Sequence, residues 1–117
     1  MAKIAPSILS ADFVNLERDI HNIEENGGDW VHVDVMDGSF VPNITIGLPV
    51  LRDIRRITNL PLDVHLMIDR PIRYAERFIK AGADWLTIHL EADTPQNTMT
   101  CLEMIRAMGC KAGLSLK

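Results

Sequence analysis

Short apolar runs alternate with longer segments of helical periodicity along the chain, and this alternation limits the possible folds more than any other feature. The runs are rich in Val, Ile and Leu and are mostly bounded by Gly, Pro, Asp or Asn, which is typical of buried strands. We predict five strands, at residues 3–9, 29–36, 62–68, 84–90 and 111–116. A chain of strands separated by helices builds a parallel sheet with helical crossovers.

Four helices are predicted between these strands, at residues 12–27, 47–57, 71–82 and 94–108. Asp12 is a suitable N-cap for the first, and Pro71 suits the first turn of the third. The first helix has its apolar positions at the i, i+3 or i+4 spacing of a buried stripe, namely Phe13, Leu16, Ile20 and Ile23. The order is therefore strand, helix, strand throughout, with no second domain.

Composition narrows the class of protein. With 117 residues, 47% of them hydrophobic, the chain has enough apolar material for one globular domain. A net charge of -4 gives no basic field to hold a nucleic acid or an acidic membrane surface. Neither a membrane-spanning run nor a signal-peptide core is expected, so we predict a soluble cytoplasmic protein. We interpret Cys101 and Cys110 as reduced packing residues.

The side-chain alternation within three of the runs distinguishes a closed barrel from an open, doubly wound sheet. Successive side chains of a strand point to opposite faces. One face of these runs is aliphatic and the other polar: Val31, Val33 and Val35 against His32, Asp34 and Met36; Val64, Leu66 and Ile68 against Asp63, His65 and Met67; Leu86, Ile88 and Leu90 against Thr87, His89 and Glu91. Central strands of a doubly wound sheet are apolar on both faces. A polar face on three consecutive strands favours a barrel lining.

The polar face carries a candidate metal site. His32 and Asp34 are two residues apart on one strand, so their side chains emerge on the same face, and His65 is expected at a similar height on the next strand. Two imidazoles and one carboxylate are a plausible ligand set for Zn2+, Fe2+ or Mn2+. Alternatively, each of the three is a hydrogen-bonded structural residue.

Several other residues near the ends of these runs allow both a structural and a functional interpretation. Met36 and Met67 are either core filler or an apolar, polarizable wall beside a reacting carbon. Ser7 and Ser10 flank the end of the first run, and Ser10 is either a helix cap or a donor to substrate. The loop that starts at Asp37 has a length typical of a loop that covers a substrate, and its Asp37, Phe40 and Asn43 could equally be turn and packing residues.

Several motifs together resemble those of the ribulose-phosphate 3-epimerase family. They are Ser-Ile-Leu-Ser-Ala-Asp-Phe at 7–13, His-Val-Asp-Val-Met-Asp-Gly at 32–38, Phe-Val-Pro-Asn at 40–43, Asp-Val-His-Leu-Met at 63–67 and Gly-Ala-Asp at 82–84. The resemblance covers the whole chain. It implies an α/β fold of the (β/α)8 TIM barrel class, of which residues 1–117 would form roughly the first half.

The resemblance also implies an activity and roles for residues. The family interconverts ribulose 5-phosphate and xylulose 5-phosphate with a divalent metal ion, and its full-length members are expected to be homo-oligomers. His32, Asp34 and His65 would be three of four metal ligands, and Asp34 would also be one of two acid/base carboxylates. Ser10 and His65 would contact the sugar phosphate, while Met36 and Met67 would form an apolar surface next to the reacting carbon.

The second carboxylate and the phosphate-binding loops belong to later strands of the family barrel. Residues 1–117 alone are therefore expected to be catalytically incomplete, with unpaired strand edges that favour association or partial disorder. Two alternatives stay open at this point. One is a hexulose 6-phosphate 3-epimerase, which shares these motifs, and the other is a half-barrel module without catalysis.

Overall fold

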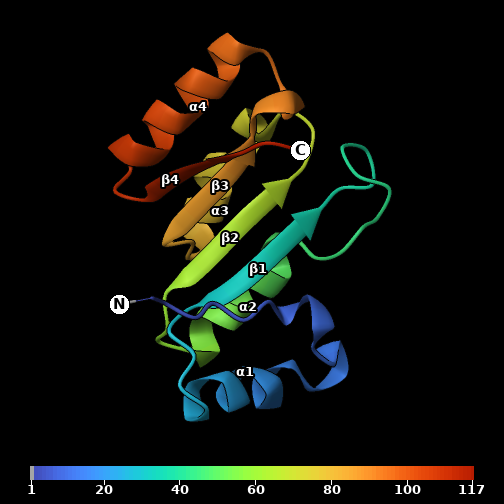
Figure 1. Cartoon of the computed structure of the whole chain (residues 1–117), viewed down its shortest axis with the longest axis vertical. Helices are drawn as coiled ribbons and strands as arrows, with labels where there is room; N and C mark the ends of the chain where they lie inside the picture. Colours follow the sequence, from blue (N-terminus) through green and yellow to red (C-terminus); the bar gives the residue numbers. More distant parts are fainter. Residues whose placement is uncertain (1) are drawn as a thin grey trace.

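The computed structural model describes residues 2–117, which form a parallel four-stranded sheet with helices packed against it (Figure 1). The strands lie in the order β1-β2-β3-β4, so each strand pairs with the next one along the chain. In Figure 1, α2 and α3 lie behind the sheet, whereas α1 and α4 lie near its two opposite edges. This arrangement matches part of a (β/α)8 barrel.

Strands and helices alternate as predicted. The strands are β1 (Val31–Met36), β2 (Leu62–Met67), β3 (Trp85–His89) and β4 (Lys111–Ser115). The helices are α1 (Leu16–Glu25), α2 (Leu48–Ile57), α3 (Ala75–Ala81) and α4 (Pro95–Ala107), with single 3-10 turns at Ile8–Ser10, Phe13–Asn15, Pro71–Arg73 and Leu90–Ala92. Among residues 2–117, no helix combines the length and the apolar character needed to cross a membrane.

The predicted strand at residues 3–9 is wrong in its assignment, although the segment does run beside β1. The backbone N–H of Trp30 donates to the Ile4 carbonyl, and that of His32 donates to the Pro6 carbonyl, with one parallel bridge between Ser7 and His32. Pro6 has no N–H to donate back, and the chain turns into a 3-10 helix at Ile8. The contact with β1 is therefore one row of hydrogen bonds and not a full ladder.

Two helices begin later than the sequence pattern indicates. Asp12 does act as a cap, accepting a hydrogen bond from Val14 N at 3.1 Å, but it caps a 3-10 turn and α1 starts only at Leu16. Phe13 consequently lies outside the helical stripe and is 47% exposed, so its prediction as a core position is wrong. Pro71 likewise opens a 3-10 turn, with α3 following at Ala75.

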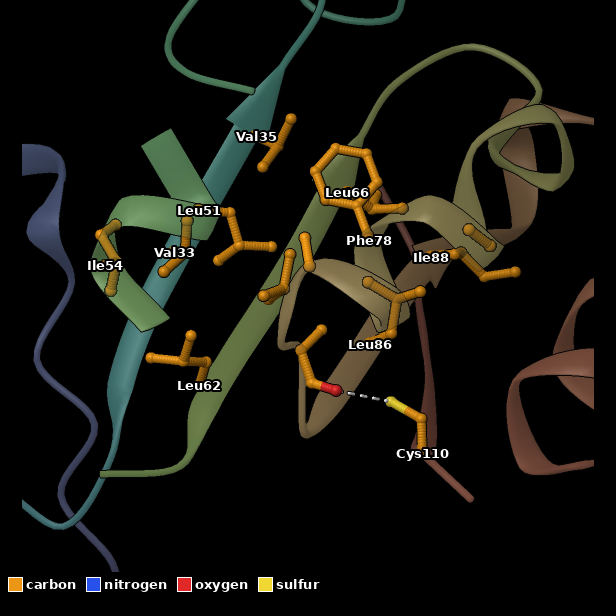
Figure 2. Close-up of a cluster of buried hydrophobic side chains, with 14 of the residues drawn as sticks. Val33, Val35, Leu51, Ile54, Leu62, Leu66, Phe78, Leu86, Ile88 and Cys110 are labelled. Atoms are coloured by element: carbon orange, nitrogen blue, oxygen red, sulfur yellow. Dashed lines mark hydrogen bonds between the residues drawn. The ribbon is translucent and has the colours of Figure 1, made fainter. Parts of the chain in front are cut away.

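The hydrophobic core fills the space between the sheet and its helices (Figure 2). Val33, Leu62 and Leu86 contribute from the strands, and Leu51 contributes from α2, all fully buried. Both cysteines are buried and free, as predicted, and Cys110 Sγ lies 3.5 Å from the Ala83 carbonyl oxygen, the dashed contact of Figure 2. Burial raises the pKa of each thiol to about 11, which makes them unreactive packing residues.

An arginine in α2 ties together the amino-terminal ends of β2 and β3. Arg55 donates to the Leu60 carbonyl at 2.8 Å and to Asp84 Oδ2 at 2.9 Å, and the same carboxylate oxygen accepts from Leu62 N. Gly82 lies against this arginine with φ of 125°, and a Cβ there would come within 2.4 Å of Arg55 Cδ. The amino-terminal ends of β2 and β3 are thus held by structural contacts.

Candidate metal centre

The register of the parallel strands arranges the polar face in rows. His32 pairs with Asp63, and two residues further on Asp34 pairs with His65. Each imidazole therefore lies beside a carboxylate on the neighbouring strand. These side chains are partly buried, while the residues between them along each strand point into the core.

Three of these side chains come together as predicted. Ligand atoms of His32, Asp34 and His65 all lie within 4.8 Å of one another, which is the spacing of groups that can share one ion. His32 Nε2 is 2.9 Å from Asp34 Oδ1, and His65 Nδ1 is 3.3 Å from the same oxygen. Two imidazole nitrogens thus converge on one carboxylate oxygen. Because nitrogen and carboxylate donors are the ones that Zn2+, Fe2+ and Mn2+ accept, the donor set fits a divalent ion.

Opposite influences act on the two histidines of the cluster. A hydrogen bond to Asp63 raises the pKa of His32 above its usual value of 6.5, against the lowering effect of burial, and the negative charge of Asp34 adds to the rise. Burial lowers the pKa of His65, and the nearby His89 lowers it further. His65 is therefore the more readily available of the two as a neutral ligand, whereas an ion at His32 must compete with a proton.

Three further residues contact the cluster, and none of them has a role that follows from the sequence pattern. Ser7 Oγ donates to Asp34 Oδ2 at 2.9 Å, Asp63 Oδ2 lies 2.8 Å from His32 Nδ1, and His89 Nε2 lies 2.7 Å from His65 Nε2. The sequence pattern identifies Asp63 and His89 only as members of the polar face. The sequence did contain a signal for Asp63, because Asp63 precedes His65 by two residues just as His32 precedes Asp34.

The remaining predicted site residues lie around the cluster. Met36 and Met67 end their strands as a registered pair one row beyond Asp34 and His65, both partly buried. Ser10 is exposed in its 3-10 turn. It is Ser7, at the start of the same turn, that hydrogen-bonds Asp34. Substrate contacts by Ser10, His65 and the two methionines stay predictions.

Asp37, which follows β1, is a loop anchor. Its Oδ1 accepts from the backbone N–H groups of Ser39 and Phe40, and its Oδ2 accepts from that of Asp69 at 2.7 Å. Burial would raise the pKa of Asp37, but these three donors together hold it below its usual value. The carboxylate is therefore occupied in joining the loop after β1 to the end of β2.

Comparison with known proteins places the chain in a family. The model of the ribulose-phosphate 3 epimerase family matches residues 3–117. The chain is 52% identical over 113 residues to the ribulose-phosphate 3-epimerase of Treponema pallidum, covering 97% of this chain and 51% of that protein. It is 53% identical over 116 residues to the enzyme of that name from Bacillus subtilis, covering 99% of this chain and 52% of that protein. The chain thus spans about half the length of the curated relatives it matches.

A solved structure shares the fold at much lower sequence similarity. The 7,8-dihydropteroate synthase of Vibrio fischeri superposes with a TM-score of 0.63 at 11% identity, over 96% of this chain and 42% of that one. This similarity concerns the fold alone. The family model, which matches residues 3–117, carries the assignment, and the matched segment contains His32, Asp34 and His65. The chain belongs to the ribulose-phosphate 3-epimerase family.

Proposed function

We propose that the polar face of the sheet is the metal-binding half of an epimerase active site. The reaction is the interconversion of D-ribulose 5-phosphate and D-xylulose 5-phosphate by removal and return of the proton at C3. The observation that carries this proposal is the convergence of His32, Asp34 and His65 within 4.8 Å in a chain of this family. Scattered structural histidines would not be expected to converge on a single carboxylate oxygen.

His32, Asp34 and His65 are the residues that would hold a divalent ion. When bound, the ion supplies positive charge that stabilises the negative charge on a substrate oxygen as the proton next to the carbonyl leaves. The surrounding residues support these ligands, since Ser7 donates to Asp34 and Asp63 contacts the second nitrogen of His32. The donor chemistry fits Zn2+, Fe2+ and Mn2+ alike.

Asp34 is proposed as the base that takes the C3 proton. Its side chain is partly buried, and the Ser7 hydroxyl holds one of its oxygens in place. Asp37, the next acid along the chain, has its two oxygens occupied by three backbone N–H groups, so it is a poor alternative. Met36 and Met67 would then form the apolar wall next to the reacting carbon, with His65 and Ser10 in contact with the substrate.

Inversion at C3 also requires an acid on the opposite face of that carbon. Asp34 provides the carboxylate on one face, and by resemblance the second carboxylate of the family lies on a later strand of the barrel. A cytoplasmic location and a homo-oligomeric assembly belong to the same proposal.

The test is an epimerase assay on the protein at its natural length. The metal is first removed with a chelator, and Zn2+, Fe2+ and Mn2+ are then added back separately. We expect turnover of D-ribulose 5-phosphate to disappear on stripping and to return with at least one ion. Full turnover in the stripped protein would contradict the metal role. Turnover of a hexulose 6-phosphate in place of the pentulose phosphate would keep the mechanism and change the substrate.

A further inference from the structure

Both ring nitrogens of each histidine in the cluster have a polar contact. The two rings differ in which nitrogen lies next to Asp34. His32 directs Nε2 toward Asp34, at 2.9 Å, and Nδ1 toward Asp63, at 2.8 Å. His65 directs Nδ1 toward Asp34, at 3.3 Å, and Nε2 toward His89, at 2.7 Å. A different nitrogen of each ring therefore faces the point where an ion would lie.

On His32 the outer contact decides which nitrogen carries the proton. Asp63 is the registered partner of His32 on β2, and an ionised carboxylate can only accept a hydrogen bond. The proton of a neutral His32 therefore lies on Nδ1, and the lone pair of Nε2 is left to face Asp34. A carboxylate in this place also limits rotation of the ring.

On His65 the outer contact is a second imidazole. Two ring nitrogens at 2.7 Å form a hydrogen bond only when one donates and the other accepts. A His65 that binds an ion through Nδ1 must carry its proton on Nε2, so His89 Nε2 must accept. His89 then has its own proton on Nδ1, a buried atom with no hydrogen-bond partner among residues 2–117, at 3.6 Å from Glu91 Oε1. A small movement of Glu91 would complete that bond.

We propose that Asp63 and His89 are positioning residues that hold the two ligand histidines in opposite tautomers, His32 as an Nε2 ligand and His65 as an Nδ1 ligand. The proposal rests on the metal site of the proposed function. Neither residue touches the ion or the substrate; each acts through the ring it contacts. His89 is only 7% exposed and lies 5.1 Å from the Phe40 ring, centroid to centroid, so its own orientation is restricted.

The first test uses the unmodified protein at its natural length, loaded with Zn2+ because this ion is diamagnetic. A long-range 1H–15N spectrum identifies the proton-bearing nitrogen of each ring. We expect the proton on Nδ1 in His32 and on Nε2 in His65. Zn2+ bound with the proton on the same nitrogen in both rings would overturn this inference and leave the metal site standing. A failure to bind Zn2+, Fe2+ or Mn2+ at all would overturn both.

The second test measures Zn2+ affinity by competition with a chelator in variants of the two residues. Asp63→Leu and His89→Phe remove the acceptors, and we expect each to weaken Zn2+ binding about 10- to 100-fold. Asp63→Asn keeps an acceptor oxygen of the same size and should recover most of the affinity. Asp53→Asn is the matched control, because Asp53 is an exposed residue of α2 whose partner is Arg56. Unchanged affinity in both Asp63→Leu and His89→Phe would overturn the proposal.

The ring spectra of the same variants distinguish a positioning role of Asp63 and His89 from a purely structural one. Asp63→Leu should disturb the proton position of His32 and leave that of His65, and His89→Phe should do the reverse. Equal disturbance of both rings in each variant would contradict separate positioning roles. Should a variant fail to fold, as judged by circular dichroism, the spectrum of the unmodified protein still decides the assignment.

Discussion

The two faces of the same strands differ sharply in what they do. On the face toward the helices, Val33, Val64 and Leu86 form a registered row of fully buried side chains. One residue further along each strand, on the other face, the row consists of Asp34, His65 and Thr87, all partly buried.

The difference shows how one set of strands supplies stability and chemistry from separate side chains. Burial of the aliphatic row removes apolar surface from water, which is the main favourable term in folding. Ionisable groups on the other face gain little from burial, but their fixed spacing places one candidate ligand atom each of His32, Asp34 and His65 within 4.8 Å of one another. Substitutions on one face should therefore change stability, and those on the other should change metal binding and catalysis.

The largest effect is expected from Asp34→Asn. An amide cannot take up the C3 proton, so exchange of that proton with solvent should fall by about 10²- to 10⁴-fold in the protein at its natural length. Deuterium incorporation from D2O into the sugar phosphate measures this rate. Asp53→Asn, on the exposed side of α2, is the control and should leave it unchanged. Exchange that persists in Asp34→Asn would place the base elsewhere.

Loss of a ligand histidine should come next. His32→Ala and His65→Ala each remove one of three convergent donors, so metal affinity should fall more than the roughly 10- to 100-fold typical of losing an outer partner. The rings are partly exposed, so the free energy of unfolding of the metal-free protein should change little. Metal analysis and denaturant unfolding provide the two readouts. The same metal content as the parent in both variants would rule out the ligand assignment.

A substitution on the other face should give the opposite result. Leu66 is fully buried beneath the helices, and Leu66→Ala should lower the free energy of unfolding by about 2–5 kcal/mol through lost burial and the cavity left behind. Metal affinity of the folded variant should stay close to that of the parent. If Leu66→Ala weakened metal binding as strongly as His65→Ala does, the two faces would not be functionally separate.

The smallest expected effect is a pH dependence of stability in the metal-free protein. The pKa of His32 is raised by its hydrogen bond to Asp63, so its stabilising contribution is complete below about pH 6.5 and is lost as pH rises through the folded-state value. Burial lowers the pKa of His65, so its contribution is present above about pH 6.5 and is lost as pH falls. His32→Gln should therefore destabilise more at acidic pH, and His65→Gln more at alkaline pH. The measurement is the free energy of unfolding of both variants at several pH values. The opposite pH dependence in the two variants would show that these assignments are wrong.

Much of this division could be predicted from the sequence. The period of two in β1, β2 and β3 separates the faces, and the spacing of His32 and Asp34 with His65 on the next strand indicates that these three side chains lie close together. These predictions succeed because they depend only on local alternation and on parallel strand order. The strand predicted at 3–9 is wrong because an apolar run does not by itself show whether the backbone can form a full ladder. Pro6 has no N–H to donate to a neighbouring strand.

The outer partners of the cluster were harder to predict, because they depend on register. Whether Asp63 faces His32 or lies a row away is decided by how the two strands are aligned, and composition and periodicity do not report that alignment. The contact of Ser7 with Asp34 depends on an irregular segment that pairs with β1 at a single bridge. His89 reaches His65 from the end of β3, two residues beyond Thr87, where the pairing of β2 with β3 ends.

The central claim is that His32, Asp34 and His65 hold a divalent ion, and locating that ion by anomalous diffraction tests it most directly. Crystals of the protein at its natural length would be grown with Zn2+ and measured on both sides of the zinc absorption edge. We predict one strong peak about 2.0–2.2 Å from His32 Nε2, His65 Nδ1 and an Asp34 oxygen. A peak away from these three side chains, or none in crystals of protein with full epimerase activity, would contradict the account.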